Sequence, residues 1–138
     1  MTTTTSGSDD ARDRARRVAS AAFAHFADAL ATGAWAPFLA CLTDDFEFWF
    51  PTGRFKGRHA GKAAAVTFFD YVSTVYPGGL FVTLDRVMAS ETSVAFEFRD
   101  TGLLFGREPY ANRVVIVLDV RDDRICGYRE YFGSDGRP

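Results

Sequence analysis

Cysteine and histidine are scarce in this 138-residue sequence, which has two of each. Cys41 and Cys126 lie in apolar contexts on separate segments, so we expect reduced core cysteines and no disulfide. His25 and His59 are distant from each other and have no close acidic or thiol companion. The sequence therefore predicts no metal site, because metal ligands come in clusters.

The sequence also lacks the features of membrane and nucleic-acid proteins. No apolar run approaches the length that spans a bilayer, and we expect no signal peptide before the domain. The net charge of -2 argues against the basic face that is typical of nucleic-acid-binding proteins. Gly53, Gly57 and Gly61 follow neither the dinucleotide pattern nor that of a phosphate loop. We expect a cytoplasmic protein that uses no cofactor and binds neither nucleic acid nor membrane.

Aromatic residues, in contrast, are abundant. The chain has 14 Phe, and hydrophobic residues make up 47% of it. This composition supports a real core and leaves aromatic area that could line an apolar cavity, although plain core packing is the alternative for any single ring. The length suits one domain. We expect a single domain over residues 9–133, a disordered tail over residues 1–8 and a short tail over residues 134–138.

Periodicity predicts three helices and five strands. Apolar residues at three- and four-residue steps indicate helices over residues 8–33, 34–42 and 62–76. Alternating patterns indicate strands over residues 44–50, 80–89, 92–100, 110–121 and 124–133. The Gly-rich segment 51–61 reads as a loop. This order predicts an α+β fold, in which a curved antiparallel sheet is covered on its one apolar face by three helices of the N-terminal half.

Alternation assigns two faces to this sheet. Tyr128, Glu130 and Phe132 share one side of the last strand, and we place this side under the helices together with Phe96 and Ile116. The opposite face carries charges around an apolar middle, with Glu97, Arg99, Arg113, Val115, Val117, Asp119, Arg129 and Tyr131. We expect this outer face to form a homodimer, and a solvated ladder of ion pairs is the alternative.

Glu130 is the leading catalytic candidate because the pattern points its carboxyl inward among apolar side chains. A lone carboxylate in an apolar cavity loses hydration, so its pKa should rise. Such a group is a good general acid or base near neutral pH. The alternatives are a structural pairing with Arg86, Asn112 or a tyrosine, and a strand bulge that turns Glu130 to solvent.

Three segments carry a resemblance to a known superfamily: "FADALATGAWAPFLACLTDDFEFWFP", "FKGRHAGKAAAVTFFDYV" and "GREPYANRVVIVLDVRDDRICGYREYFG". They resemble the cone-shaped proteins that include nuclear transport factor 2, ketosteroid isomerase and SnoaL-like polyketide cyclases. The resemblance implies that the sheet and the three helices form a cone-shaped barrel with an apolar pocket. It is weak evidence for any one reaction, because this fold hosts many.

The catalytic groups of ketosteroid isomerase are replaced by apolar residues when its pattern is carried over residue by residue. The position of that enzyme's base, immediately before the proline that ends the first strand, is Phe50. Its oxyanion-hole tyrosine aligns with Phe26, the supporting tyrosine with Phe69, and the protonated aspartic acid with Ile116. Hydrocarbon can neither take a proton nor donate one to an enolate. The resemblance therefore implies a lined pocket without steroid isomerisation by that mechanism.

The SnoaL-like cyclases keep their acid-base carboxylate on the last strand, and in that register it falls at Glu130, one methylene longer than the family's Asp. The resemblance thus implies that Glu130 is catalytic, and we expect Tyr128, on the same face of the strand, to be catalytic with it. The residues expected to contact substrate are Asn112, Phe26, Phe50, Phe69, Ile116, Phe96, Phe132 and His25. The epoxide hydrolases of this superfamily use an Asp-Arg-Asp cluster, for which only Asp100 and Arg86 are candidates.

We expect a protein that binds an apolar small molecule of polyketide or polycyclic type. The expected reaction is a cofactor-free cyclisation, isomerisation or dehydration, in which Tyr128 and Asn112 orient a substrate oxygen. The alternative is a non-catalytic module that binds a hydrophobic ligand or docks a partner as a dimer.

Overall fold

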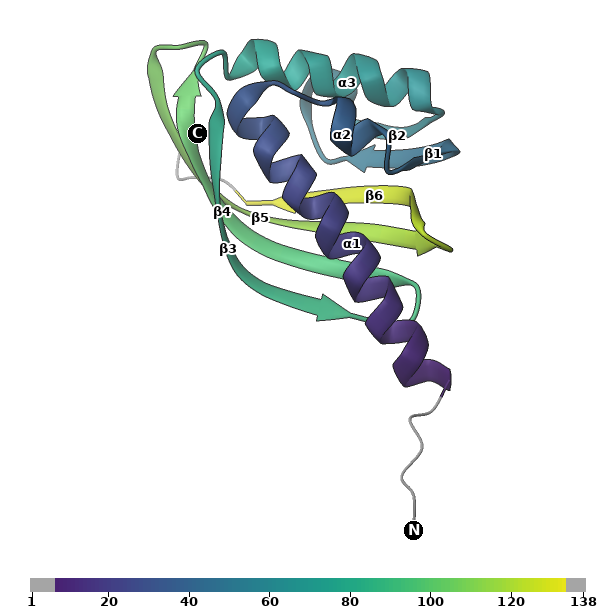
Figure 1. Cartoon of the computed structure of the whole chain (residues 1–138). Helices are drawn as coiled ribbons and strands as arrows, with labels where there is room; N and C mark the ends of the chain where they lie inside the picture. The colour runs from purple at the N-terminus through teal and green to yellow at the C-terminus, as the bar shows by residue number, and fades with distance from the viewer. Residues whose placement is uncertain (1–6, 134–138) are drawn as a thin grey trace.

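The structure, a computed structural model, describes residues 7–133. Its helices are α1 (Gly7–Thr32), α2 (Ala36–Leu39) and α3 (Lys62–Val75). Its strands are β1 (Leu42–Phe50), β2 (Gly57–Ala60), β3 (Leu80–Ala89), β4 (Ser93–Leu104), β5 (Glu108–Arg121) and β6 (Arg124–Phe132). A short 3-10 turn, η1 (Gly53–Phe55), joins β1 to β2. Figure 1 shows α1 crossing the concave face of the curved sheet, with α2 and α3 beside its upper end.

The strands form one open sheet in the order β2-β1-β6-β5-β4-β3. All neighbours are antiparallel except β1 and β6, which are parallel. The predicted α+β fold, with a curved sheet under three helices, is confirmed. The sheet is not closed into a barrel, because β2 and β3 remain as its two edges. None of the helices within residues 7–133 has the length and apolar character to cross a membrane.

Several boundaries differ from the sequence prediction, among them the end of the second helix, where β1 already begins at Leu42. The segment 51–61, expected as a loop, contains β2, which pairs with β1 from Glu47 opposite Ala60 to Phe50 opposite Gly57. Strand β4 continues past residue 100 to Leu104, because its hairpin partner β5 already begins at Glu108. Helix α1 begins at Gly7, inside the expected N-terminal tail. The rest of that tail, and the expected tail over 134–138, lie outside the described residues.

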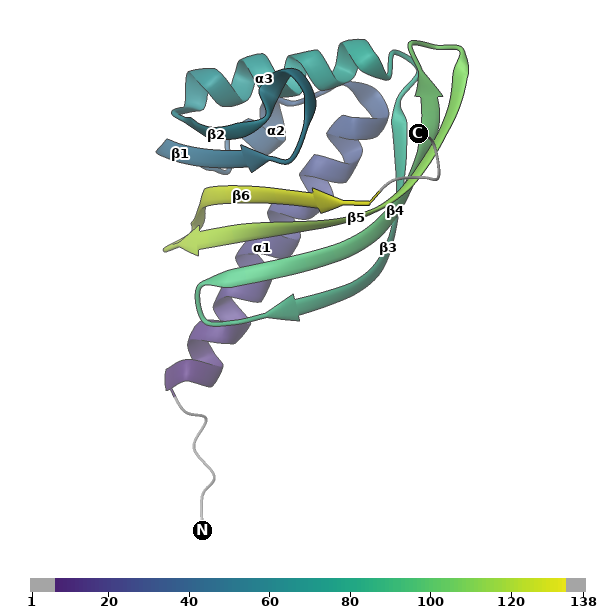
Figure 2. The ribbon, with the colours of Figure 1, turned by 180° about the vertical axis from the view of Figure 1, so that it is seen from behind.

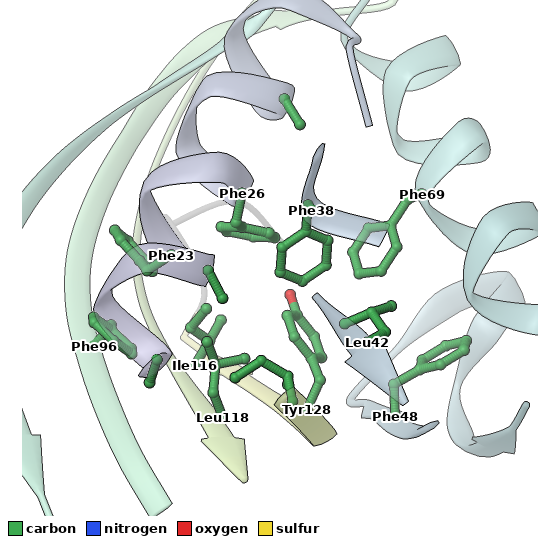
Figure 3. Packing of buried hydrophobic residues seen from close by; sticks show 14 of the residues in the cluster. Phe23, Phe26, Phe38, Leu42, Phe48, Phe69, Phe96, Ile116, Leu118 and Tyr128 are labelled. Carbon is green, nitrogen blue, oxygen red and sulfur yellow. The ribbon is translucent and has the colours of Figure 1, made fainter. Parts of the chain in front are cut away.

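The core lies between the helices and the concave face of the sheet. The inward series of β5, Val114, Ile116 and Leu118, is buried, as the alternation predicts. Phe23 of α1 stacks on Phe96 of β4 with ring centroids 4.4 Å apart. Figure 3 shows how such rings fill the space between α1, α3 and β6. Most of the abundant aromatic rings therefore serve to pack the core.

Two glycines permit a close junction between α1, β3 and β4. Gly79 precedes β3 with a φ of +96°, and a Cβ there would lie 2.3 Å from the carbonyl oxygen of Ala31. A Cβ on Gly102 would lie 2.8 Å from the carbonyl oxygen of Gly79. Real Cβ atoms do not come this close to backbone, so both positions require glycine. The junction holds the end of α1 against the bend of the sheet.

The convex face of the sheet carries no helix within residues 7–133 (Figure 2). Its charges pair across strands, for example Arg99 with Asp85 at 2.9 Å and Arg129 with Asp119. Trp49 and Tyr131 add an aromatic contact on this face, with ring centroids 5.3 Å apart. The face therefore has the mixed character that the sequence predicts, charged pairs around apolar and aromatic groups.

Candidate functional site

Two adjoining chambers lie between the helices and the concave face. The inner chamber has a volume of about 90 Å³ and the outer one a volume of about 400 Å³. The residues that line both are Phe50, Phe68, Val72, Tyr76, Tyr110 and Phe132. These shared side chains form the boundary between the two chambers, which we call the neck.

Strand β6 supplies two polar side chains of the inner chamber, Tyr128 and Glu130. Alternation turns Tyr128, Glu130 and Phe132 toward the helices, and all three line this chamber. Strand β6 lies between β1 and β5, so its inward side chains stand in the middle of the sheet. The Tyr128 hydroxyl donates a hydrogen bond to Oε1 of Glu130. This contact is the tyrosine pairing left open for Glu130, and it coexists with the position of the carboxyl in the chamber.

The Tyr128 ring is fixed by aromatic packing. Its centroid lies 5.9 Å from that of Phe26 on α1 and 5.7 Å from that of Phe69 on α3. Figure 3 shows the ring rising from β6 with its hydroxyl directed toward these helical side chains. A hydroxyl held this rigidly orients the carboxyl that it contacts, at no entropic cost when a ligand arrives.

Burial raises the pKa of Glu130 from its ordinary value to about 7, and the negative charge of Asp100 adds to the effect. The Tyr128 hydrogen bond acts in the opposite direction, because it stabilises the carboxylate. At neutral pH both protonation states of Glu130 are therefore populated. A carboxyl in this condition can both accept and return a proton.

Asp100 is a second carboxyl in the inner chamber, and the sequence prediction did not include it among the site residues. It is only 4% exposed, and burial raises its pKa to about 7. Its Oδ1 atom has no hydrogen-bond partner among the described residues. The signal for Asp100 was present in the alternation Phe96, Phe98, Asp100, which continues the inward face of β4.

The neck carries a chain of neutral polar groups. The Asn112 side-chain amide donates to the Tyr110 hydroxyl at 3.1 Å, and the rings of Tyr110 and Tyr76 lie 5.2 Å apart. Burial raises the pKa of Tyr76 and that of Tyr110, so both hydroxyls stay protonated. These groups can hydrogen bond to a ligand without adding charge to the neck.

The structure gathers most, but not all, of the predicted site residues. Phe26, Phe50 and Phe69 line the inner chamber with the three residues of β6, and Asn112 lines the outer chamber. Ile116 and Phe96 line neither chamber, because they are packed in the core at 0% and 1% exposure.

His25 is also misplaced by the sequence prediction. It lies on the exposed side of α1, because a step of one residue from Phe26 turns a side chain by about 100° around a helix. Arg86 pairs with Glu97 on the outer face, so it does not join Asp100 in a cluster of the epoxide hydrolase type.

The outer chamber is closed on one side by η1. Here His59 Nε2 lies 2.8 Å from the carbonyl oxygen of Phe55, and the Phe55 ring packs on Phe68. Between residues 7 and 133 no group of three or more His, Cys, Asp or Glu side chains is arranged to hold a metal ion.

Comparisons with known proteins agree with this architecture. A structure of an NTF2-like protein from Anabaena variabilis is 51% identical, with a TM-score of 0.86 over 99% of this chain and 97% of that one. An LEH-like epoxide hydrolase from M. tuberculosis is 24% identical, with a TM-score of 0.67 over 88% of this chain and 84% of that one. A candidate polyketide cyclase from Xanthomonas campestris is 21% identical, with a TM-score of 0.68 over 89% of this chain and 93% of that one.

The last two similarities show the fold alone. The search of curated proteins finds no match. The family model described as "SnoaL-like domain" matches residues 23–128, which include all of α2, α3 and β1 to β5 and parts of α1 and β6. The chain therefore belongs to the SnoaL-like domain family of NTF2-like proteins.

Proposed function

We propose that this protein binds an apolar small molecule and catalyses a cofactor-free proton transfer, with Glu130 as the acid-base group. One observation carries the proposal: the Glu130 carboxyl lies in an aromatic chamber with a pKa of about 7. Among the described residues only its Oε1 receives a hydrogen bond, from Tyr128. The other oxygen is left to take a proton from the substrate and to return it.

Asp100 gives the chamber a second proton carrier. Two nearby carboxyls that both have a pKa of about 7 share protons at neutral pH, so one can act as acid while the other acts as base. This division of roles suits an isomerisation, in which a proton leaves one atom and another is delivered elsewhere. It equally suits a dehydration, in which the acid protonates the departing hydroxyl.

The chambers limit the size of the reacting group. The inner chamber, at about 90 Å³, accommodates only a small part of a ligand, whereas the outer one, at about 400 Å³, falls within the range of ~300–1,000 Å³ for small-molecule pockets. A substrate of the proposed apolar, polyketide-like type would keep its bulk in the outer chamber. Its reacting end would pass the neck to Glu130.

The pKa of Glu130 tests this proposal without a known substrate. A ¹³C NMR titration of the full chain, with only the Glu side-chain carboxyls labelled so that Asp100 does not contribute, should give a midpoint near pH 7 that disappears in Glu130→Gln. The matched control is Glu97→Gln, on the outer face of β4, which should leave that midpoint in place. A Glu130 midpoint near its ordinary value of 4.5 would refute the acid-base role. Once a substrate is found, Glu130→Gln should lower kcat with little change in KM.

A non-catalytic binding module is the second candidate, favoured by one specific observation. The pocket positions that carry chemistry in ketosteroid isomerase hold Phe26, Phe50 and Phe69 here, and these rings line the inner chamber. A ligand recovered unchanged after prolonged incubation at pH 7 with the pure protein, although it binds in the chambers, would support this function over catalysis.

We also propose that the convex face forms a homodimer. Its apolar and aromatic middle includes Val115, Val117 and Tyr131, and Tyr131 is 45% exposed in the single chain. Sedimentation equilibrium should give twice the chain mass, and Tyr131→Asp should shift the protein toward monomer. A monomeric wild-type protein at high concentration would refute the dimer.

A further inference from the structure

The two chambers differ in the sign of their charge. In the inner chamber the charged residues of the lining are Asp100 and Glu130, both acidic. In the outer chamber Arg54 is the one charged side chain among the described residues of the lining. A molecule that occupies both chambers thus meets a cation at one end and carboxyls at the other.

The Arg54 guanidinium is positioned by aromatic rings. Its central carbon lies 5.2 Å from the ring centroid of Tyr71 and 5.9 Å from that of Phe55. Within residues 7–133 Arg54 has no hydrogen-bond or ion-pair partner. Stacking on a ring leaves the in-plane N–H donors of a guanidinium available, and their fork matches a carboxylate.

The backbone that carries Arg54 is also anchored. The turn η1 closes with a hydrogen bond from the Lys56 N–H to the carbonyl oxygen of Gly53 at 3.1 Å. Phe55 packs edge-on against Phe68, with centroids 5.2 Å apart, and contacts Tyr71 at 5.3 Å. Arg54 therefore stands at a defined place on the wall of the outer chamber.

We propose that Arg54 is an anion subsite, and that the protein selects ligands with an apolar body and a carboxylate at one end. The carboxylate binds Arg54 at the wall of the outer chamber, and the apolar body passes the neck. The neutral, reacting end of the ligand enters the inner chamber. Repulsion by Asp100 and Glu130 opposes the reverse orientation, so the charges order the ligand as well as hold it.

This subsite deepens the proposed function, because it names the substrate class for the same chambers. It does not require Glu130 to be catalytic, since a binding module would select the same ligands. The two ideas therefore fail separately: a normal Glu130 titration would refute the chemistry alone, and the loss of carboxylate preference would refute the subsite alone.

Three probes with one apolar body test the subsite: 4-phenylbutanoate, 4-phenylbutanamide and 4-phenylbutan-1-amine. Each is titrated into the full chain at pH 8 and low salt by isothermal calorimetry. We expect the carboxylate to bind about tenfold more tightly than the amide, since a charge-assisted contact is added. Added salt should weaken the binding of the carboxylate and leave the binding of the amide unchanged. The amine should bind no better than the amide.

Arg54→Gln should remove this preference, bringing the carboxylate to within about twofold of the amide while the amide affinity stays unchanged. Lys56→Gln is the matched control: a neighbouring exposed cation that lines neither chamber, it should change neither affinity. Arg54→Lys should recover only part of the preference, because an ammonium lacks the planar fork. Glu130→Gln should not reduce the preference, because it removes a charge that repels the carboxylate and leaves Arg54 in place.

Four results would overturn the subsite. With the wild type, these are equal binding of carboxylate and amide, tighter binding of the amine than of the carboxylate, and no binding of any probe. With the variants, it is an equal loss of the carboxylate preference in Lys56→Gln and Arg54→Gln. The second result would instead assign the inner carboxyls as the site of a cationic group.

Discussion

The half-buried Glu130 carboxyl should make the protein less stable as pH rises, and Glu130→Gln should reduce this dependence. The pKa of Glu130 is about 7 in the folded chain against an ordinary value of 4.5. Between these values the folded state binds more protons than the unfolded state, so the free energy of unfolding falls with increasing pH. The difference corresponds to a loss of about 3 kcal/mol, complete above the folded pKa.

Gln is neutral at every pH and can still accept the hydrogen bond from Tyr128, so the variant escapes this loss. We expect Glu130→Gln to match the wild type within about 1 kcal/mol below pH 4.5 and to exceed its stability by up to about 3 kcal/mol at pH 8.5. A site group whose removal stabilises the fold is the usual mark of a functional residue held at a cost to stability.

Urea unfolding followed by tryptophan fluorescence measures this effect, since Trp35 is buried in the core. Curves at several pH values from 4.5 to 8.5 give the free energy of unfolding for the wild type, Glu130→Gln and the outer-face control Glu97→Gln. The control should follow the wild type. If the Glu130→Gln and wild-type values differ by the same amount at every pH, Glu130 has no raised pKa and the reasoning is refuted.

Three further predictions concern the same chamber and its frame. Asp100→Asn removes a negative charge that raises the pKa of Glu130, so a ¹³C titration should show that pKa falling below about 7. Tyr128→Phe removes the hydrogen bond that lowers it, so the same titration should show a rise, and an unchanged midpoint in either variant would contradict the assigned cause. Gly79→Ala should lower the free energy of unfolding by about 2 kcal/mol or more, because the positive φ and the close Ala31 carbonyl both exclude a side chain. Gly78 has open space around it, so Gly78→Ala should lower the free energy of unfolding by less than about 1 kcal/mol in the same urea assay.

The parts of the site that follow from alternation could be predicted from sequence. In β6 a period of two places Tyr128, Glu130 and Phe132 on one face, and the apolar neighbours decide which face is inward. The same period places Asp100 on the inward face of β4 with Phe96 and Phe98, but it does not show that Asp100 shares a chamber with Glu130, because that depends on how the strands are arranged in the sheet. The continuation to Leu104 depends on pairing with β5.

Other features are set by tertiary contacts that local patterns do not encode. The four residues of β2 include Gly57 and Arg58 and lack apolar alternation, so the strand exists because it pairs with β1. The parallel pairing of β1 with β6 joins segments some eighty residues apart, and no short-range signal specifies it. Arg54 lies in the segment that the sequence predicts as a loop, and its contact with the Tyr71 ring depends on α3, which no local pattern places beside it.

The position of β6 in the sheet has a consequence for how the molecule is made. This strand is the last of the six in the chain, yet it lies between β1 and β5. Until the ribosome has released it, the nascent chain holds two halves of a sheet with unpaired inner edges, β1 on one and β5 on the other. Such edges invite association with other chains. Folding of the newly made chain is therefore complete only when β6 inserts between β1 and β5, and the same step places Glu130 in the inner chamber.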